Sequence, residues 1–123
     1  MPYISQEVRK ALTKGEDMHN PGELNYLISR HYLRLDQNLA DQREQFKEKL
    51  ARLLKLYVEH RGLSYQTIND VIGVLECVRL EMLYRSLYKH LFEGILLQAS
   101  ENFYKTVAIP YERDKLKLNG DIL

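Results

Sequence analysis

Apolar residues recur at three- and four-residue intervals along most of the chain, which is the spacing of one face of an α-helix. One such run begins directly after Asn20 and Pro21, residue types that favour the cap and the first turn of a helix. Glu23 stands where the carboxylate of a capping box reaches back to the helix start. The apolar positions that follow are Leu24, Leu27, Ile28 and Leu35. We therefore expect a helix from Asn20 to about Leu35.

A shorter helix is expected before this one. Ser5 can cap a helix that reaches about Lys14, and Gly15 is typical of a helix end. The residues between Gly15 and Asn20 indicate a loop, and residues 1–4 are expected to lie along the body as an extended arm.

Between Ala40 and His60 the apolar spacing becomes heptad-like, as in helices that pack along a seam. The seam positions are Leu39, Phe46, Leu50, Leu53 and Tyr57. Gly62 follows as a typical residue just beyond a helix C-terminus, so we expect the helix to end there.

Ser64 is suited to cap the next helical pattern, which continues to about Val107. Gly94 and Ser100 are the positions at which so long a helix could bend or break. Pro110 is expected to end this helix or to start the next element, because the residue before a proline favours extended backbone. A short C-terminal helix and a tail are expected over residues 110–123.

The length of this helix has a consequence for assembly. A helix of about 40 residues is about 60 Å long, whereas a compact domain of this size has a radius of gyration near ~14 Å. The helix would overhang its own domain and expose apolar side chains, which a second copy of the chain would cover. We therefore expect a single all-α domain over residues 1–123, a helical bundle with one or two long helices that is completed by homo-oligomerisation.

Charge and hydropathy narrow the classes of partner. The 123 residues include 18 Lys and Arg against 17 Asp and Glu, a net charge of +1. A protein that binds duplex nucleic acid usually carries a basic excess, so nucleic acid is not an expected partner. No run approaches the ~20 apolar residues of a membrane span, and the start of the chain lacks the apolar stretch of a signal peptide. We expect a cytoplasmic protein that does not contact membrane.

Cysteine and tyrosine usage add two expectations. Cys77 is the only cysteine, which excludes an internal disulfide and a metal site made of several cysteines. It lies in an apolar helical context, so we expect a buried thiol. The chain has nine tyrosines and no tryptophan. Tyrosine suits either partly solvent-exposed ligand pockets and interfaces or the edges of a small core.

Catalytic motifs are largely missing from the sequence. The four histidines, His19, His31, His60 and His90, include no pair at the four-residue spacing of a zinc-binding helix face. Glu16 and His19 match the spacing of a helical di-iron motif, but a second copy is missing. Phosphate-binding loops, nucleophile elbows and dinucleotide fingerprints are also missing. We therefore predict no catalytic residue, metal or cofactor.

The sequence argues against one class of enzyme without excluding it. All-helical nucleotide pyrophosphohydrolases hold magnesium with acidic pairs spaced three or four residues apart on facing helices. Glu76 and Glu81 are five residues apart, and Glu44 and Glu48 lie in a basic stretch typical of a solvated face.

A polar stripe does stand out on the expected long helix, formed by Asn69, Gly73 and Glu76. Glycine inside a helix costs about 1 kcal/mol against alanine, a cost usually explained by close approach of another helix or of a ligand. Both explanations are open here. Further along, Glu81-x-x-Tyr84-Arg85 recurs as Glu101-x-x-Tyr104-Lys105, which suits either base stacking with phosphate binding or an ordinary ion pair on a helix surface.

Several blocks together resemble an uncharacterised family of small helical proteins found largely in phages and prophages. The blocks are Pro2-Tyr3-Ile4 with Arg9, Pro21 to Tyr26, Tyr65 to Glu76, Pro110-Tyr111-Glu112 with Lys115, and Asn119-Gly120-Asp121. The chain departs from the family pattern at Tyr104-Lys105-Thr106, where a second basic residue is lost, and over residues 82–100, which look like an extra stretch. The resemblance implies no known activity. It implies a phage context and, with it, action in the cytoplasm of a bacterial host.

Our leading hypothesis is a non-enzymatic homo-oligomer that captures a small anionic, nucleotide-derived molecule between subunits, as a phage counter-defence sponge would. The candidate ligand contacts are Tyr3, Arg9, Asn25, Tyr26, Asn69, Glu76, Tyr104, Lys105 and Lys115. The alternatives are an inhibitor or scaffold that binds a protein through its long helix, and a divergent helical nucleotide pyrophosphohydrolase.

Overall fold

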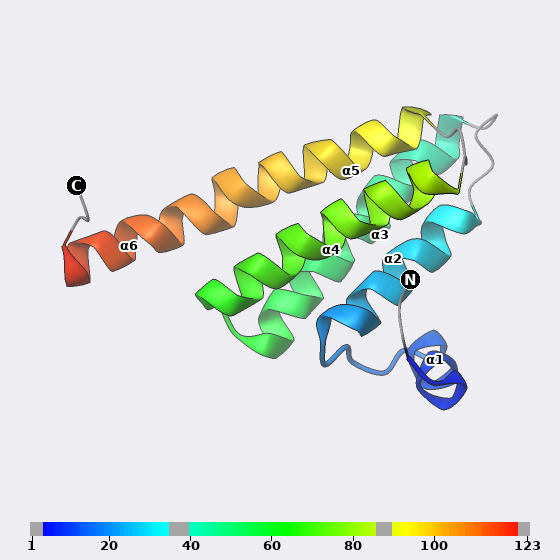
Figure 1. The fold of residues 1–123 in the computed structure, drawn as a ribbon, viewed down its shortest axis with the longest axis horizontal. Coiled ribbons are helices and arrows are strands. Elements are labelled where there is room, and N and C mark those ends of the chain that lie inside the picture. Colours follow the sequence, from blue (N-terminus) through cyan, green and yellow to red (C-terminus); the bar gives the residue numbers. More distant parts are fainter. Residues whose placement is uncertain (1–3, 35–39, 86–89, 121–123) are drawn as a thin grey trace.

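The computed structural model describes residues 4–34, 40–85 and 90–120, and every regular element in these ranges is helical (Figure 1). The elements are α1 (Gln6–Thr13), α2 (Pro21–Leu33), α3 (Ala40–Arg61), α4 (Tyr65–Tyr84), α5 (His90–Phe103), the π-helical turn η1 (Tyr104–Ala108) and α6 (Ile109–Asn119). The all-α prediction is therefore confirmed. Among the described residues, no helix combines the length and the apolar composition that a bilayer crossing requires.

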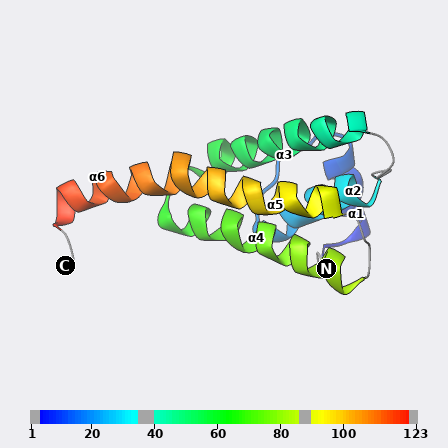
Figure 2. The ribbon, with the colours of Figure 1, turned by 90° about the horizontal axis from the view of Figure 1, so that it is seen from above.

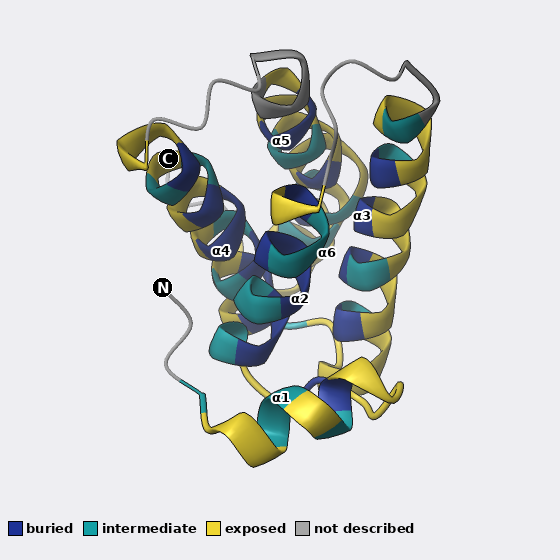
Figure 3. Ribbon diagram, turned by 90° about the vertical axis from the view of Figure 1, so that its right-hand side faces the viewer, coloured by how far each residue is buried: buried dark blue, intermediate teal, exposed yellow. Residues whose placement is uncertain are grey.

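Four of these helices form a bundle. Helix α2 packs against α3 and α4, and α5 packs against the same two helices from the other side (Figures 1 and 2). Helix α1 packs against α2 at one edge of the bundle. The buried side of each bundle helix faces its neighbours, while the exposed positions face outward (Figure 3).

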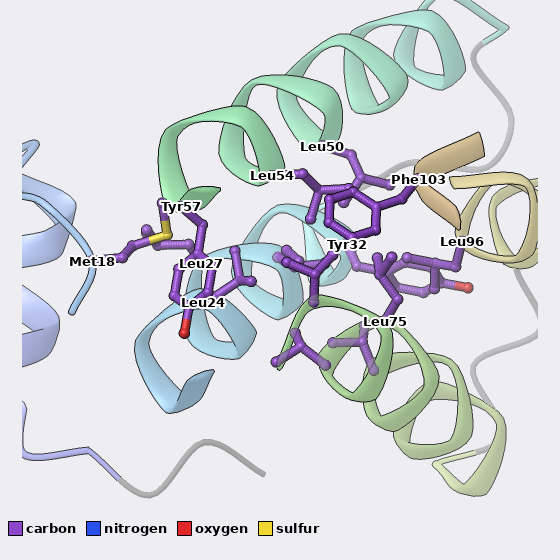
Figure 4. Close-up of a cluster of buried hydrophobic side chains, with 14 of the residues drawn as sticks. Met18, Leu24, Leu27, Tyr32, Leu50, Leu54, Tyr57, Leu75, Leu96 and Phe103 are labelled. Carbon is purple, nitrogen blue, oxygen red and sulfur yellow. The ribbon is translucent and has the colours of Figure 1, made fainter. Parts of the chain in front are cut away.

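The core lies between the four helices and is mainly aliphatic, with large aromatic side chains at intervals (Figure 4). Tyr32 of α2 and Phe46 of α3 meet edge to face, with ring centroids 5.7 Å apart. Such a pair adds about 0.5–1.5 kcal/mol beyond the burial of its area. The most deeply buried large side chains are Leu24, Ile28, Tyr32, Phe46, Leu50, Tyr57, Val71, Leu75, Val78 and Leu96. Leu39 of the expected seam lies outside the described residues.

The predicted helix starts are confirmed in atomic detail. Ser5, Asn20 and Ser64 each cap a helix, accepting a hydrogen bond from the backbone N–H three residues later at 3.2, 3.0 and 3.1 Å. The carboxylate of Glu23 also reaches back, as the capping-box spacing predicts, although it accepts from the backbone N–H of His19 at 2.9 Å. Gly62 ends α3 with a φ of +83°, a conformation that a residue with a Cβ rarely adopts.

The expectation of one helix from Ser64 to about Val107 is wrong. Helix α4 ends at Tyr84, and α5 folds back along it (Figure 1). Gly94 and Ser100, the expected break points, both lie inside α5. Folding back allows apolar side chains of both segments, such as Val78 and Leu96, to be buried within a single chain. That burial removes the reason for which the sequence pattern had suggested a partner along this helix.

Pro110 does stand in the first turn of the next element, α6, as one of the two expectations had it, but the extended backbone expected before it is wrong. Ile109 has a helical backbone, with φ −61° and ψ −49°, and the helix continues through Pro110. A proline inside an α-helix lacks one N–H and its ring collides with the carbonyl four residues earlier. The π-helical turn directly before Pro110 widens the helix and accommodates both effects. The predicted C-terminal helix is thus present, but as the continuation of α5 and η1.

The result is a rod from His90 to Asn119, whose last part extends beyond α3 and α4 (Figures 1 and 2). Helix α6 has no buried residue, and its Leu118 is 76% exposed. The overhang therefore lies in α6, and not in the segment that the sequence had indicated. Homo-oligomerisation remains a prediction. Helix α6, which has no buried residue, is the part of the described chain that a second copy could cover.

On the outer face of α4 the expected burial of Cys77 is wrong, and one of the two open explanations of Gly73 loses its support. Cys77 is exposed, because the apolar residues that bury α4 lie on the opposite side of the helix. Gly73 is also exposed, and no atom lies within 4 Å of the place where its Cβ would be. Close packing against another helix of the same chain therefore does not explain this glycine.

Candidate functional site: a basic pocket

The structure brings two of the predicted ligand contacts together. Arg9 of α1 lies over the ring of Tyr26 of α2, with its guanidinium carbon 5.6 Å from the ring centroid. This is a cation–π arrangement, which holds a guanidinium flat against an aromatic surface. The helices that place these two residues are the two that begin with the confirmed Ser5 and Asn20 caps.

Arg9 and Tyr26 line a pocket between α1, α2 and the last turn of α4, which we call the basic pocket. Its volume is about 320 Å³, at the lower end of the range for small-molecule sites. Its lining consists of Arg9, Tyr26, Ser29, Arg30, Leu33, Arg34, Glu81, Met82 and Arg85. Four of these nine residues are arginines, whereas one is acidic.

The single carboxylate in this lining is engaged by one of the arginines. Arg85 Nε donates to Glu81 Oε1 at 2.8 Å, and this hydrogen bond lowers the pKa of Glu81. Glu81 is therefore ionised near neutral pH and balances the charge of Arg85. Arg9, Arg30 and Arg34 leave the pocket with a positive excess.

Arg9 also carries an unusual buried atom. Its Nε is shielded from solvent and, within the described part of the chain, lacks a hydrogen-bond partner. An unsatisfied buried donor costs about 1–3 kcal/mol. An acceptor supplied by a ligand in this pocket would recover that free energy.

A second, smaller hollow adjoins the basic pocket on the α3 side of α2, and we call it the His31 hollow. Its volume is about 140 Å³. It is lined by His31, Arg34, Gln42, Gln45, Phe46 and Lys49, so Arg34 belongs to both linings. Burial lowers the pKa of His31, and the charges of Lys49, Arg30 and Arg34 lower it further. The positive potential therefore covers both hollows.

This shift predicts a pH dependence of stability. The pKa of His31 is below 6.5 in the folded chain and near 6.5 in the unfolded chain. As the pH falls below 6.5, the unfolded chain binds the proton first, so the free energy of unfolding decreases. Above that pH both states are neutral and the contribution vanishes.

The measurement is denaturant unfolding at about pH 7.5 and about pH 5 for the wild type and for His31→Gln. We expect the wild type to lose more stability on acidification than the variant. Equal losses would show that folding does not lower the pKa of His31.

The remaining predicted contacts lie elsewhere. Asn25 accepts a hydrogen bond from Ser29 Oγ at 3.0 Å, on α2 beside the pocket but outside its lining. Asn69 and Glu76 are exposed on α4, and Glu76 accepts a hydrogen bond from Arg79 Nε at 3.1 Å, which lowers its pKa. The last three, Tyr104, Lys105 and Lys115, are exposed along the rod, and Tyr3 lies outside the described residues. The sequence therefore predicted two members of this pocket, Arg9 and Tyr26.

The other basic members were missed, although a signal for them exists. Tyr26, Arg30 and Arg34 follow one another at four-residue intervals, which places them on one face of α2. The only sequence signal for Arg85 is the weak repeat of a glutamate, a tyrosine and a basic residue, which does not indicate a pocket. The position of Arg85 opposite α2 depends on where α4 ends, which the sequence pattern had misplaced.

A second polar cluster lies at the other end of the bundle. His60 Nε2 and His19 Nδ1 are 2.9 Å apart, and Arg61 donates to the backbone carbonyl of His19 at 2.7 Å. Asp17 lies 3.7 Å from the other nitrogen of His60. The contacts join the α1–α2 loop to the end of α3. Across the described residues, no group of three or more His, Cys, Asp or Glu is arranged to hold a metal ion.

A third hollow, larger than the basic pocket, is a groove of about 580 Å³ between α3 and the rod. Apolar side chains such as Leu54, Val58 and Phe103 form its floor. None of the predicted ligand contacts lines it, and its character differs from that of the basic pocket.

Comparison with known proteins gives a family without a known role. No match was found among curated proteins. No solved structure matches the chain either. A family model described as Domain of unknown function (DUF6899) matches residues 1–122. Since this match spans nearly the whole chain, the protein belongs to that uncharacterised family.

Proposed function

We propose that the protein is a non-enzymatic binding protein that captures a small anionic, nucleotide-derived molecule in the basic pocket. The observation that carries this proposal is the cation–π pair of Arg9 and Tyr26 in one hollow with Arg30 and Arg34. Guanidinium groups bind phosphate oxygens through paired N–H donors, and a tyrosine ring offers a face to a base. The pocket thus contains a group that can bind the phosphate of a nucleotide and a group that can bind its base.

Each group in the pocket has a separate role in this proposal. Arg30 and Arg34 bind the phosphate, because they lie one helical turn apart on α2. Tyr26 offers the ring face that Arg9 does not cover to the base or another flat group of the ligand. Arg9 covers the other face, and its Nε gains an acceptor from the ligand. Leu33 and Met82 supply the apolar part of the lining.

The test measures binding of AMP, ADP-ribose and cyclic di-AMP by thermal shift and calorimetry. A ligand that binds only the folded state must raise its stability. Arg30→Gln is expected to weaken the binding of the best of these ligands by roughly tenfold or more, because a hydrogen bond to a charged group contributes about 1.5–3 kcal/mol. Arg52→Gln removes an equal charge from an exposed position of α3 outside the lining and should leave the affinity unchanged.

Tyr26→Leu separates the stacking from the charge. It should weaken nucleotide binding while leaving the binding of inorganic pyrophosphate close to that of the wild type. Failure of every one of the three nucleotides to bind the wild type would reject the proposal. Equal effects of Arg30→Gln and Arg52→Gln would show that general charge, and not this pocket, attracts the anion.

Assembly and biological setting form the second part of the proposal. Leu33 lines the pocket and is 45% exposed, and Leu83 and Tyr84 are exposed beside Arg85. A second copy that covers these side chains would enclose the ligand between subunits. The resemblance to phage and prophage proteins suggests that the captured molecule is a nucleotide signal of a bacterial host, which makes sequestration a form of counter-defence.

One observation favours a second function, a module that binds a protein. The groove between α3 and the rod is apolar and large, and α6 extends from it with exposed Leu116 and Leu118. A pull-down that recovers one stoichiometric protein, with no small molecule retained, would support this alternative. The third possibility, a nucleotide pyrophosphohydrolase, gains no support from the carboxylates of Asp70 and Glu76 on α4. Asp70 accepts hydrogen bonds from Tyr57 and Gln66, and Glu76 is engaged by Arg79.

A further inference from the structure

We propose that the ligand carries two separate anionic groups and that the His31 hollow holds the second of them. The inference rests on the proposed function, because it assigns the first anionic group to Arg30 in the basic pocket. It adds a ligand class, a nucleotide with two phosphate groups at different positions, and a second binding site.

The geometry comes from Arg34. This residue is the C-terminal cap of α2 and lines both hollows, so the two hollows share one wall. A ligand that extends around the Arg34 side chain from the basic pocket would enter the His31 hollow. The two hollows lie on the two sides of α2, one toward α4 and the other toward α3.

The size and lining of the His31 hollow suit a compact anion. Its volume of about 140 Å³ equals only a few water molecules at ~30 Å³ each, enough for a phosphate but not for a base. Lys49 and Arg34 provide positive charge, and the side-chain amides of Gln42 and Gln45 can donate hydrogen bonds. The lining, as far as the chain is described, contains no carboxylate.

The electrostatics agree with this assignment. Lys49, Arg30 and Arg34 all act on His31, which is half-buried and resists protonation. Phe46 adds an apolar ring to the lining, while Arg34 and Lys49 are exposed, so an anion can approach both cations from solvent. An anion placed here would relieve repulsion among the three cations, whereas an anion in bulk solvent would not.

The experiment compares adenosine 3′,5′-bisphosphate with AMP by calorimetry. The wild type should bind the bisphosphate about tenfold more tightly or better. Lys49→Gln should remove most of that preference and leave the affinity for AMP within about twofold, while Lys55→Gln on the same helix should change neither value. Lys55 is exposed and lies outside both hollows.

NMR of the His31 side chain gives an independent readout. The bisphosphate should raise the pKa of His31 more than AMP does, since its second phosphate also neutralises Lys49, whereas the phosphate of AMP reaches only Arg30 and Arg34. If both nucleotides bind equally well and Arg30→Gln weakens both, the second subsite is refuted and the proposed function stands. If neither nucleotide nor any other tested anion binds, both proposals fail.

Discussion

Leu96→Ala is expected to lower the free energy of unfolding by about 2–5 kcal/mol, the range for truncating a fully buried leucine. Leu96 is 1% exposed and lies on the face of α5 that packs into the bundle (Figure 4). Its removal leaves a cavity in a core that closes only because α5 folds back on α4. The variant therefore tests the feature that the sequence pattern predicted wrongly.

Leu97→Ala is the matched control, one residue further along the same helix. Leu97 is 45% exposed, so the same truncation should cost less than about 1 kcal/mol. Chemical denaturation of both variants gives the comparison. Equal and small losses would contradict the helical hairpin, because an overhanging continuous helix would leave both leucines outside a core.

Glu23→Ala is expected to cost about 2–3 kcal/mol, because the side chain accepts two hydrogen bonds as a charged group. One comes from the backbone N–H of His19 at 2.9 Å and the other from Asn20 Nδ2 at 2.8 Å. Glu23 is buried, although it stands in the first turn of α2. Its loss releases the loop whose His19 also contacts His60 and Arg61 of α3.

Glu7→Ala provides the control, since Glu7 is also acidic and in the first turn of its helix but is exposed. Its removal takes away only a favourable interaction with the helix dipole, about 0.3–1 kcal/mol. Thermal and denaturant unfolding would separate the two variants. A Glu23→Ala variant as stable as Glu7→Ala would show that the loop is held by other contacts.

The basic pocket and the stability of the bundle are linked through helix ends. Arg30 lies in the last turn of α2, and Arg34 and Arg85 are the C-terminal caps of α2 and α4. Cations at a helix C-terminus interact favourably with the dipole, which offsets part of the repulsion among them. The bundle can therefore hold several arginines close together without a bound anion, and a ligand can still gain from the charge that remains.

Local sequence signals determined most of the helical elements. Ser5, Asn20 and Ser64 have short polar side chains that reach the backbone N–H groups of the first turn, and no distant residue is needed for that bond. Gly62 acts just as locally, through its own φ. Periodicity also identified the buried sides of α2 and α3, including Leu24, Phe46 and Tyr57.

The family-like blocks of the sequence also supplied Arg9 and Tyr26 as candidate ligand contacts, and the structure places both in the lining of one pocket. The sequence did not predict that Arg85 lines the same pocket, because that position depends on a helix end without a local signal. Tyr84-Arg85 and Tyr104-Lys105 occur in the same sequence repeat, but Arg85 lines the basic pocket, whereas Tyr104 and Lys105 are exposed on the rod outside its lining.

What only the tertiary structure decided is where the C-terminal half turns. The apolar pattern is the same for one long helix and for two helices packed against each other, because both bury one face at the same spacing. The choice depends on the total apolar area buried, which favours α5 returning to cover α4 and α3. The same packing places α2 beside the end of α4, and so it, rather than any motif, assembles the arginines of the basic pocket.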